Sequence, residues 1–155
     1  MRASPPRWVR RRFDRADLDA LARAIAEAER HTSAEVAVHL ERRIPRLTGD
    51  DPAQARARDV FLRLGLDRTR DRNAVLIYLA LDDHRLAIVG DEGVHARVGD
   101  EYWAQVRDLM VERLRQGRPR EALLAAIEAV GAILRRHFPR RPDDRDELPD
   151  RVTFD

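Results

Sequence analysis

The sequence predicts an α/β fold, a three-layer α/β/α sandwich whose small mixed sheet of three to four strands is flanked by about four helices. Two observations support this prediction. Segments with helical periodicity alternate with short apolar segments. The segment 74–81, AVLIYLAL, is apolar on both faces, as expected of a central strand covered from both sides. A chain of 155 residues is long enough for one domain with a sizeable core.

The first half of the chain predicts a helix, a strand and a second helix. Asp14 is a favourable N-cap for a helix that runs to about Arg30, with apolar residues three and four positions apart. The segment 35–41 alternates and predicts a strand with one strongly apolar face. Pro52 at a first helical position opens the second helix, which Gly65 ends.

The second half predicts two more strands and two more helices. The strand 74–81 follows the first strand through a helix, so the two should be parallel with a right-handed crossover. The strand 85–90 should return antiparallel as a hairpin. We expect a glycine-bearing loop over 91–99, and then helices over 100–117 and 119–139.

The charges divide the chain into three parts. Residues 1–13 carry five arginines and no acidic residue, and Pro5 and Pro6 argue against a helix there, so we predict a basic arm. Residues 14–139 form the domain, with a net charge of −1, and 140–155 form an acidic extended tail of net charge −2. All 30 basic residues are arginine, and the total is +2, which excludes a generally basic nucleic-acid binder.

Other classes of protein are excluded by absent residue types. Without cysteine there is no disulfide, thiol nucleophile, Cys-ligated zinc or iron–sulfur cluster. The first residues lack the apolar stretch of a signal peptide, and no apolar run approaches ~18 residues. We therefore expect a soluble, cytoplasmic protein. The all-arginine usage fits a thermophile or a GC-rich genome equally well.

Several stretches resemble the TPM domain, a family also catalogued as a phosphatase domain. They are TSAEVAVH (32–39), RNAVLIYLA (72–80), IVGDEGVH (88–95), VGDEYW (98–103), and HFP (137–139) followed by DELPD (146–150). The last pair resembles the short, single-domain bacterial branch of the family. The resemblance implies an α/β/α sandwich and links to phosphatase activity, divalent-cation binding, photosystem repair and membrane-protein assembly. Ala74 departs from the glycine that the family usually has there.

Two edges of the predicted sheet gather polar residues. Ligands of open α/β sheets usually bind beyond the carboxyl ends of the strands. That edge would hold His39, Glu41, Asp82, Asp83 and His84. The opposite edge holds the family-like motifs, so we place the site there. Its candidate metal ligands are Glu35, Asp67, Asp71, Asn73, Asp91 and Glu92. His95, in the predicted glycine loop next to this site, is the candidate functional histidine.

Oxygen ligands from three chain segments suit a hard cation such as Ca²⁺ or Mg²⁺, and no organic cofactor is expected. The sequence thus predicts a binding or interaction module with a divalent-cation site and a protein partner. The same residues equally suit structural capping of strands and turns. A metal-dependent phosphatase is the alternative, with Asp71 or Asp91 holding metal or attacking and Arg72 binding phosphate oxygens.

The arginine-rich arm offers a third interpretation. Its arginines and Trp8 suit contact with nucleic-acid phosphates or an anionic membrane surface. We favour instead a solvated tail, or one whose Trp8 and Phe13 pack back on the domain, because the remaining chain shows no matching basic stripe.

Overall fold

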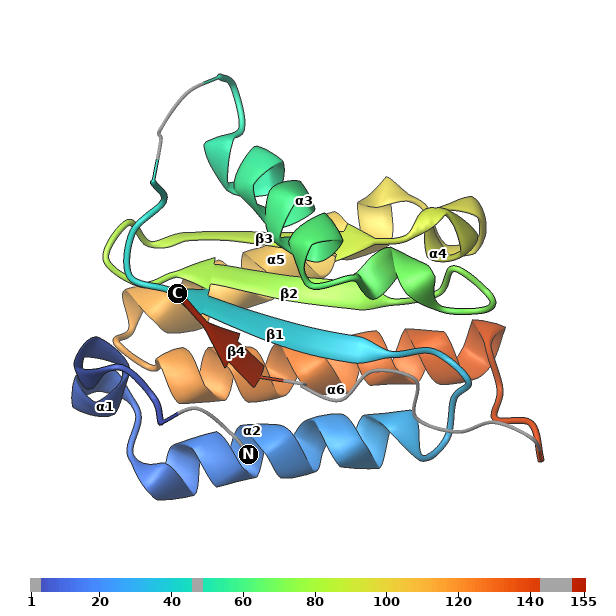
Figure 1. Ribbon diagram of the computed structural model, residues 1–155, viewed down its shortest axis with the longest axis horizontal. Helices are drawn as coiled ribbons and strands as arrows, with labels where there is room; N and C mark the ends of the chain where they lie inside the picture. The colour runs from blue at the N-terminus through green and yellow to red at the C-terminus, as the bar shows by residue number, and fades with distance from the viewer. Residues whose placement is uncertain (1–3, 46–48, 143–151) are drawn as a thin grey trace.

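A four-stranded mixed sheet forms the centre of the computed structural model, which describes residues 4–45, 49–142 and 152–155 (Figure 1). The strands lie in the order β3-β2-β1-β4. They are β1 (Val36–Glu41), β2 (Val75–Ala80), β3 (Arg85–Gly90) and β4 (Val152–Phe154). The strand β1 pairs with β2 in parallel, and β2 pairs with β3 antiparallel, as predicted. The strand β4 adds a parallel neighbour to the free edge of β1.

Helices cover both faces of the sheet, which confirms the predicted sandwich (Figure 1). They are α1 (Arg7–Arg12), α2 (Arg15–Glu29), α3 (Pro52–Arg63), α4 (Glu92–Val98), α5 (Asp100–Arg115) and α6 (Pro119–His137), with a 3₁₀ turn, η1 (Leu66–Arg68). The helix α3 packs on one face of the sheet, and α2, α5 and α6 form the layer on the other.

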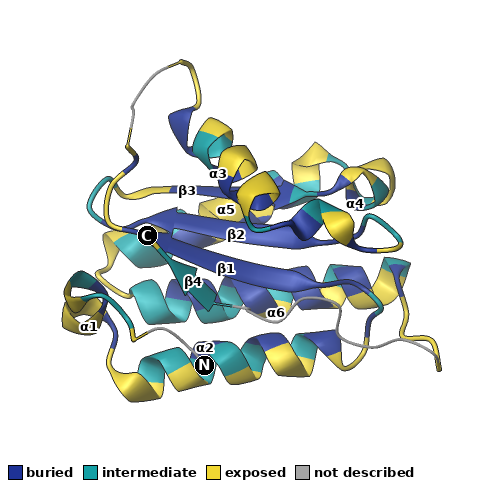
Figure 2. Cartoon of the chain, viewed as in Figure 1, coloured by how far each residue is buried: buried dark blue, intermediate teal, exposed yellow. Residues whose placement is uncertain are grey.

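Successive side chains of the strands point to opposite faces of the sheet and so contribute to two hydrophobic cores, one on each face. In β2, Val75, Ile77 and Leu79 join the core under α2, α5 and α6, while Leu76 and Tyr78 join the core under α3. All six residues of β1 are buried as well (Figure 2). The expectation that β1 has one strongly apolar face therefore understated its burial, because α3 covers the second face.

Local sequence signals place the helix ends. The predicted N-cap, Asp14, is present at α2 and forms a capping box with Asp17: the backbone N–H of Asp17 donates to the Asp14 carboxylate at 2.7 Å, and the backbone N–H of Asp14 donates to the Asp17 carboxylate at 3.0 Å. Pro52 opens α3, as predicted. Gly65 follows α3 with φ +72°, a left-handed conformation that glycine adopts without strain.

The prediction of a loop over 91–99 is wrong in part, because the structure has α4 there. Asp91 caps this helix, with its carboxylate accepting from the backbone N–H of Glu92 at 2.8 Å. Seven residues and an internal glycine give little helical periodicity to detect. The backbone of α4 instead fits closely against the loop that precedes β2.

The predicted arm contains α1, so the expectation that Pro5 and Pro6 argue against a helix there is wrong. A helix that begins just after proline loses no internal hydrogen bond. Val9 is fully buried and Phe13 is 1% exposed, and Trp8 packs against the same core. The alternative in which Trp8 and Phe13 pack back on the domain is therefore confirmed.

The predicted acidic tail is described at its two ends. Residues 143–151 lie outside the described part of the chain, and Val152–Phe154 form β4. This strand was not predicted. Among the described residues, no helix combines the length and the apolar character that crossing a bilayer requires.

Candidate functional site

The two ends of the central strands form two polar edges. We call the edge where β1 and β2 begin the amino edge, and it comprises residues 32–35, 69–74 and 90–93. We call the edge where β1 and β2 end the carboxyl edge. In Figure 1, α4 lies beside the amino edge and α1 near the carboxyl edge.

Backbone hydrogen bonds hold the three segments of the amino edge side by side. The N–H of Val75 donates to the carbonyl of Glu35 at 2.8 Å, and the N–H of Asp91 donates to that of Ala74 at 2.9 Å. Residues that are distant in sequence are thus brought to one edge, as the predicted topology required.

Arg72 and Asp91 form the central ion pair of this edge. The guanidinium Nε and Nη2 atoms of Arg72 lie 2.8 and 3.1 Å from the two carboxylate oxygens of Asp91. This hydrogen bonding raises the pKa of Arg72. Arg72 has φ +50°, and a Cβ added at Gly93 would lie 2.5 Å from the carbonyl oxygen of Asp71. Glycine at position 93 is thus required for this close approach.

Asn73 is the most buried of the predicted ligands, with 1% of its surface exposed. Its amide nitrogen donates to the hydroxyl of Ser33 at 3.3 Å. Its buried carbonyl oxygen Oδ1 has no hydrogen-bond partner among the described residues. An unsatisfied buried oxygen costs about 1–3 kcal/mol, so it requires an explanation.

The other predicted ligands differ in burial and in their partners. Glu35 is buried, Asp67 is half-buried, and Asp71 forms an ion pair with Arg141. Glu92 is 3.6 Å from Arg72. The predicted carboxylates do not form a cluster of three within 4.8 Å of one another in the described part of the chain. His95 is largely exposed on α4, 3.5 Å from Asp100.

The carboxyl edge holds a buried network centred on Glu41. The hydroxyl of Tyr78 donates to this carboxylate at 2.6 Å, and Arg56 on α3 donates twice, at 2.9 and 2.7 Å. Burial and the hydrogen bond to Glu41 raise the pKa of Tyr78, so its hydroxyl stays protonated. The hydrogen bonds that Arg56 donates to Glu41 raise the pKa of Arg56.

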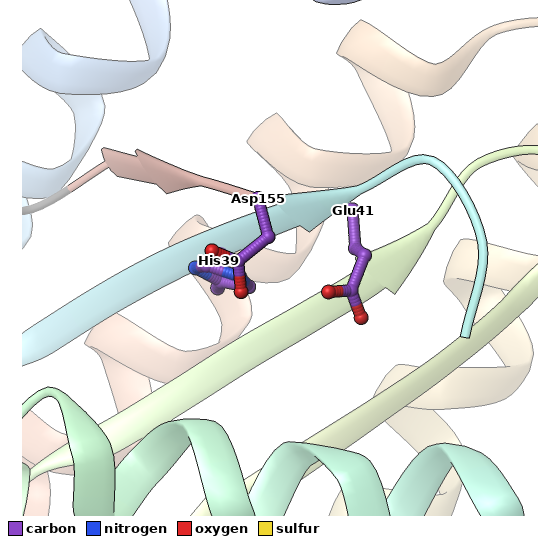
Figure 3. A group of neighbouring side chains, drawn as sticks. All are labelled: His39, Glu41 and Asp155. Atoms are coloured by element: carbon purple, nitrogen blue, oxygen red, sulfur yellow. The ribbon is translucent and has the colours of Figure 1, made fainter. Parts of the chain in front are cut away.

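His39 connects this network to the end of the chain (Figure 3). Its Nε2 lies 3.0 Å from the carboxylate of Asp155, and its Nδ1 lies 2.6 Å from the hydroxyl of Thr153. Burial lowers the pKa of His39, against the opposing charge of Asp155. The imidazole stacks on the ring of Tyr78 in the neighbouring strand, with ring centroids 6.2 Å apart.

Three side chains at this edge could together contact a metal ion. Ligand atoms of His39, Glu41 and Asp155 lie within 4.8 Å of one another (Figure 3). However, Arg56 donates to both carboxylates, and Arg63 donates to Asp155. The two arginines balance the two negative charges. The network is therefore a complete set of ion pairs that fixes β4 to β1.

Sequence reasoning placed His39 and Glu41 at this edge but missed Asp155 and its arginine partners. The short apolar pattern around Thr153 was the available signal for a strand. Three residues are too few to distinguish such a strand from an irregular tail.

The family model for the TPM domain matches residues 11–133. The chain belongs to the TPM domain family. The matched residues contain α2 to α5, the strands β1 to β3 and most of α6, whereas α1 begins before them and β4 lies beyond them. The search of curated proteins found no match.

Solved structures share this fold. The BA42 protein from the psychrophilic bacterium Bizionia argentinensis is 36% identical, with a TM-score of 0.80 over 92% of this chain and 95% of that one. The N-terminal domain of a P. gingivalis protein is 22% identical, with a TM-score of 0.67 over 82% and 79%. The N-terminal domain of the cg2496 protein from Corynebacterium glutamicum is 16% identical, with a TM-score of 0.60 over 86% of each chain. The last two show the fold alone.

Proposed function

We propose that this TPM domain is a binding module that takes a divalent cation, Ca²⁺ or Mg²⁺, at its amino edge. The observation that carries the proposal is the buried, unpartnered Oδ1 of Asn73. Amide and carboxylate oxygens are the ligands that these hard cations prefer. A cation at this position would satisfy the oxygen, and Asp91, on the same edge, supplies a carboxylate as a further candidate ligand.

Arg72 donates to the two carboxylate oxygens of Asp91 that a cation would need. Its guanidinium neutralises the carboxylate, which is 7% exposed, while the arginine side chain itself is 43% exposed. A divalent ion would compete with Arg72 for the oxygens of Asp91, which makes the two variants below informative.

Calorimetric titration with CaCl₂ and with MgCl₂ tests the proposal. Asn73→Ala and Asp91→Asn each remove a ligand and should weaken binding at least tenfold. Arg72→Gln removes the competing cation and should strengthen binding several-fold. Asp59→Asn, an exposed carboxylate on α3, is the matched control and should leave binding unchanged.

The two variants distinguish a cation site from a structural ion pair. At a cation site, Arg72→Gln should raise the affinity for the cation and Asp91→Asn should lower it. If the native chain produces no heat at millimolar Ca²⁺ or Mg²⁺, the proposal is wrong. It is also wrong if Arg72→Gln and Asp91→Asn weaken binding equally, because both changes would then act through the loss of the ion pair.

Phosphatase activity is the alternative proposal for the same residues, and the same samples test it. Hydrolysis of an aryl phosphate with added metal should be lost in Asp91→Asn and in Asp71→Asn if these carboxylates act in the reaction. Hydrolysis that survives both substitutions would come from elsewhere.

A further inference from the structure

A cavity of about 330 Å³ lies between α1 and the carboxyl edge, at the opposite end of the sheet from the proposed cation site. We call it the arginine pocket. It is lined by Arg7, Trp8, Arg11, Arg12, Arg42 and Asp82. Its volume is within the range typical of small-molecule sites.

Burial of α1 fixes the shape of this pocket. Val9 and Phe13 anchor the helix in the core, at 0% and 1% exposure. The C-cap N–H of Phe13 donates to the carbonyl of Val9 at 2.8 Å. The side chains that face the pocket are therefore presented by a docked helix and not by a solvated tail.

Four arginines surround the pocket, and one carboxylate opposes them. Asp82 receives hydrogen bonds from Arg12 at 3.0 Å and from Arg42 at 2.9 Å, which fixes these two guanidinium groups. Arg7 and Arg11 form no ion pair with any residue that the structure describes. They are four positions apart on one helix face, where like charges repel. This excess positive charge has no compensating structural partner in the described chain.

We propose that the arginine pocket binds a phosphate ester whose organic part packs on the indole of Trp8. Guanidinium groups bind phosphate oxygens through paired hydrogen bonds, and the indole offers a flat apolar surface to a ring or glycerol group. The location supports the proposal independently. Arg42 follows β1 and Asp82 follows β2, so the pocket lies beyond the carboxyl ends of two adjacent parallel strands.

Two sources could supply this chemistry, a free nucleotide or a phospholipid headgroup. The test uses ADP for the first source and, for the second, vesicles of phosphatidylcholine with one-fifth phosphatidylglycerol. EDTA is present throughout, so that the amino edge holds no cation. Binding of ADP is followed through the NMR signals of the two indole N–H groups, and binding of vesicles is followed by cosedimentation. Trp103 is the internal reference, because it lies in the core on α5.

We expect the Trp8 signal to shift with ADP, or the protein to sediment with the vesicles, while the Trp103 signal stays in place. The double variant Arg7→Gln/Arg11→Gln should weaken the observed binding at least tenfold. Arg10→Gln, which removes the same charge from the same helix but does not line the pocket, should change binding less than twofold.

ADP binding identifies a nucleotide-type ligand, and vesicle binding without ADP binding identifies a headgroup. Either result supports the proposal when it depends on Arg7 and Arg11. The proposal is overturned if neither probe binds, or if Arg10→Gln weakens binding as much as the double variant does. In the second case the effect would be one of net charge and not of the pocket.

Discussion

The two edges of the sheet use charged residues in different ways. At the carboxyl edge, Glu41 and Asp155 are matched by Arg56 and Arg63, and both ring nitrogens of His39 are bonded, to Thr153 and Asp155. At the amino edge, the buried oxygen of Asn73 has no partner among the described residues. The charged groups around Glu41 all have partners, and together they attach β4 to the sheet; we call this set the closed network. The oxygen of Asn73 is left without a partner among the described residues, so we call the amino edge the open edge, and the proposal of a cation site rests on it.

The largest loss of stability should follow from removing Arg56, one partner of the closed network around Glu41. Arg56→Met keeps much of the side-chain volume. Among the described residues, it leaves the carboxylate of Glu41, which is 5% exposed, with the hydroxyl of Tyr78 as its remaining donor. Breaking a buried ion pair on one side typically costs 3–5 kcal/mol. Because Arg56 is 21% exposed and water can enter, we expect a loss of about 3 kcal/mol in urea unfolding.

Two comparisons make this prediction specific. Arg58→Met, on the exposed face of the same helix, should cost less than about 0.5 kcal/mol. The double variant Glu41→Gln/Arg56→Met removes the unpaired charge and should be more stable than Arg56→Met alone. Equal stability of the two variants would mean that Glu41 is not held as a buried anion.

The contrast between the edges also explains which features were predictable from sequence. The core strands and the capped helices follow from local signals, such as the uniformly apolar 75–80 or the Asp14–Asp17 capping box. The amino-edge residues could be assembled because strand order alone brings their three segments together. The ion pair between Arg72 and Asp91 could not be predicted in the same way. Whether Arg72 contacts Asp91 or a phosphate depends on the left-handed backbone conformation at Arg72.

The carboxyl edge was harder to predict because one of its members, Asp155, lies far in sequence from its partners His39, Arg56 and Arg63. Asp155 meets His39 across 116 residues of sequence, through a strand of three residues. Similarly, α1 is six residues long and follows two prolines, so burial of Val9 and Phe13, and not helix propensity, decides its formation.

A smaller loss of stability is expected from overpacking the amino edge at Gly93. In Gly93→Ala, the new methyl group would lie 2.5 and 2.7 Å from the carbonyl oxygens of Asp71 and Arg72, so the loop or α4 must move. Overpacking of this kind costs about 1–3 kcal/mol, and alanine returns about 0.5–1 kcal/mol through helix propensity. We therefore expect a net loss of about 1 kcal/mol in urea unfolding.

The exposed neighbour His95 supplies the control for Gly93→Ala. His95→Ala also places alanine on α4, but on its exposed surface, and should alter the free energy of unfolding by less than about 0.5 kcal/mol. A Gly93→Ala protein as stable as the native chain would show that α4 is not tightly packed on the loop, and that the amino edge is less fixed than the carboxyl edge.

The smallest effect concerns how the closed network responds to pH. Burial lowers the pKa of His39 below its unfolded value near 6.5, so the unfolded chain binds a proton more readily than the folded one. The stability contributed by the neutral imidazole is thus complete above pH 6.5 and is lost as pH falls from there toward the folded-state pKa.

We expect urea unfolding to show a lower free energy at pH 5.5 than at pH 7.5, and His39→Gln to reduce that difference. His31→Gln, which replaces an exposed histidine, should retain it. If His39→Gln shows the full native difference, protonation of His39 is not what couples the carboxyl edge to pH, and the ion pairs of Asp155 hold β4 regardless of the charge on the imidazole.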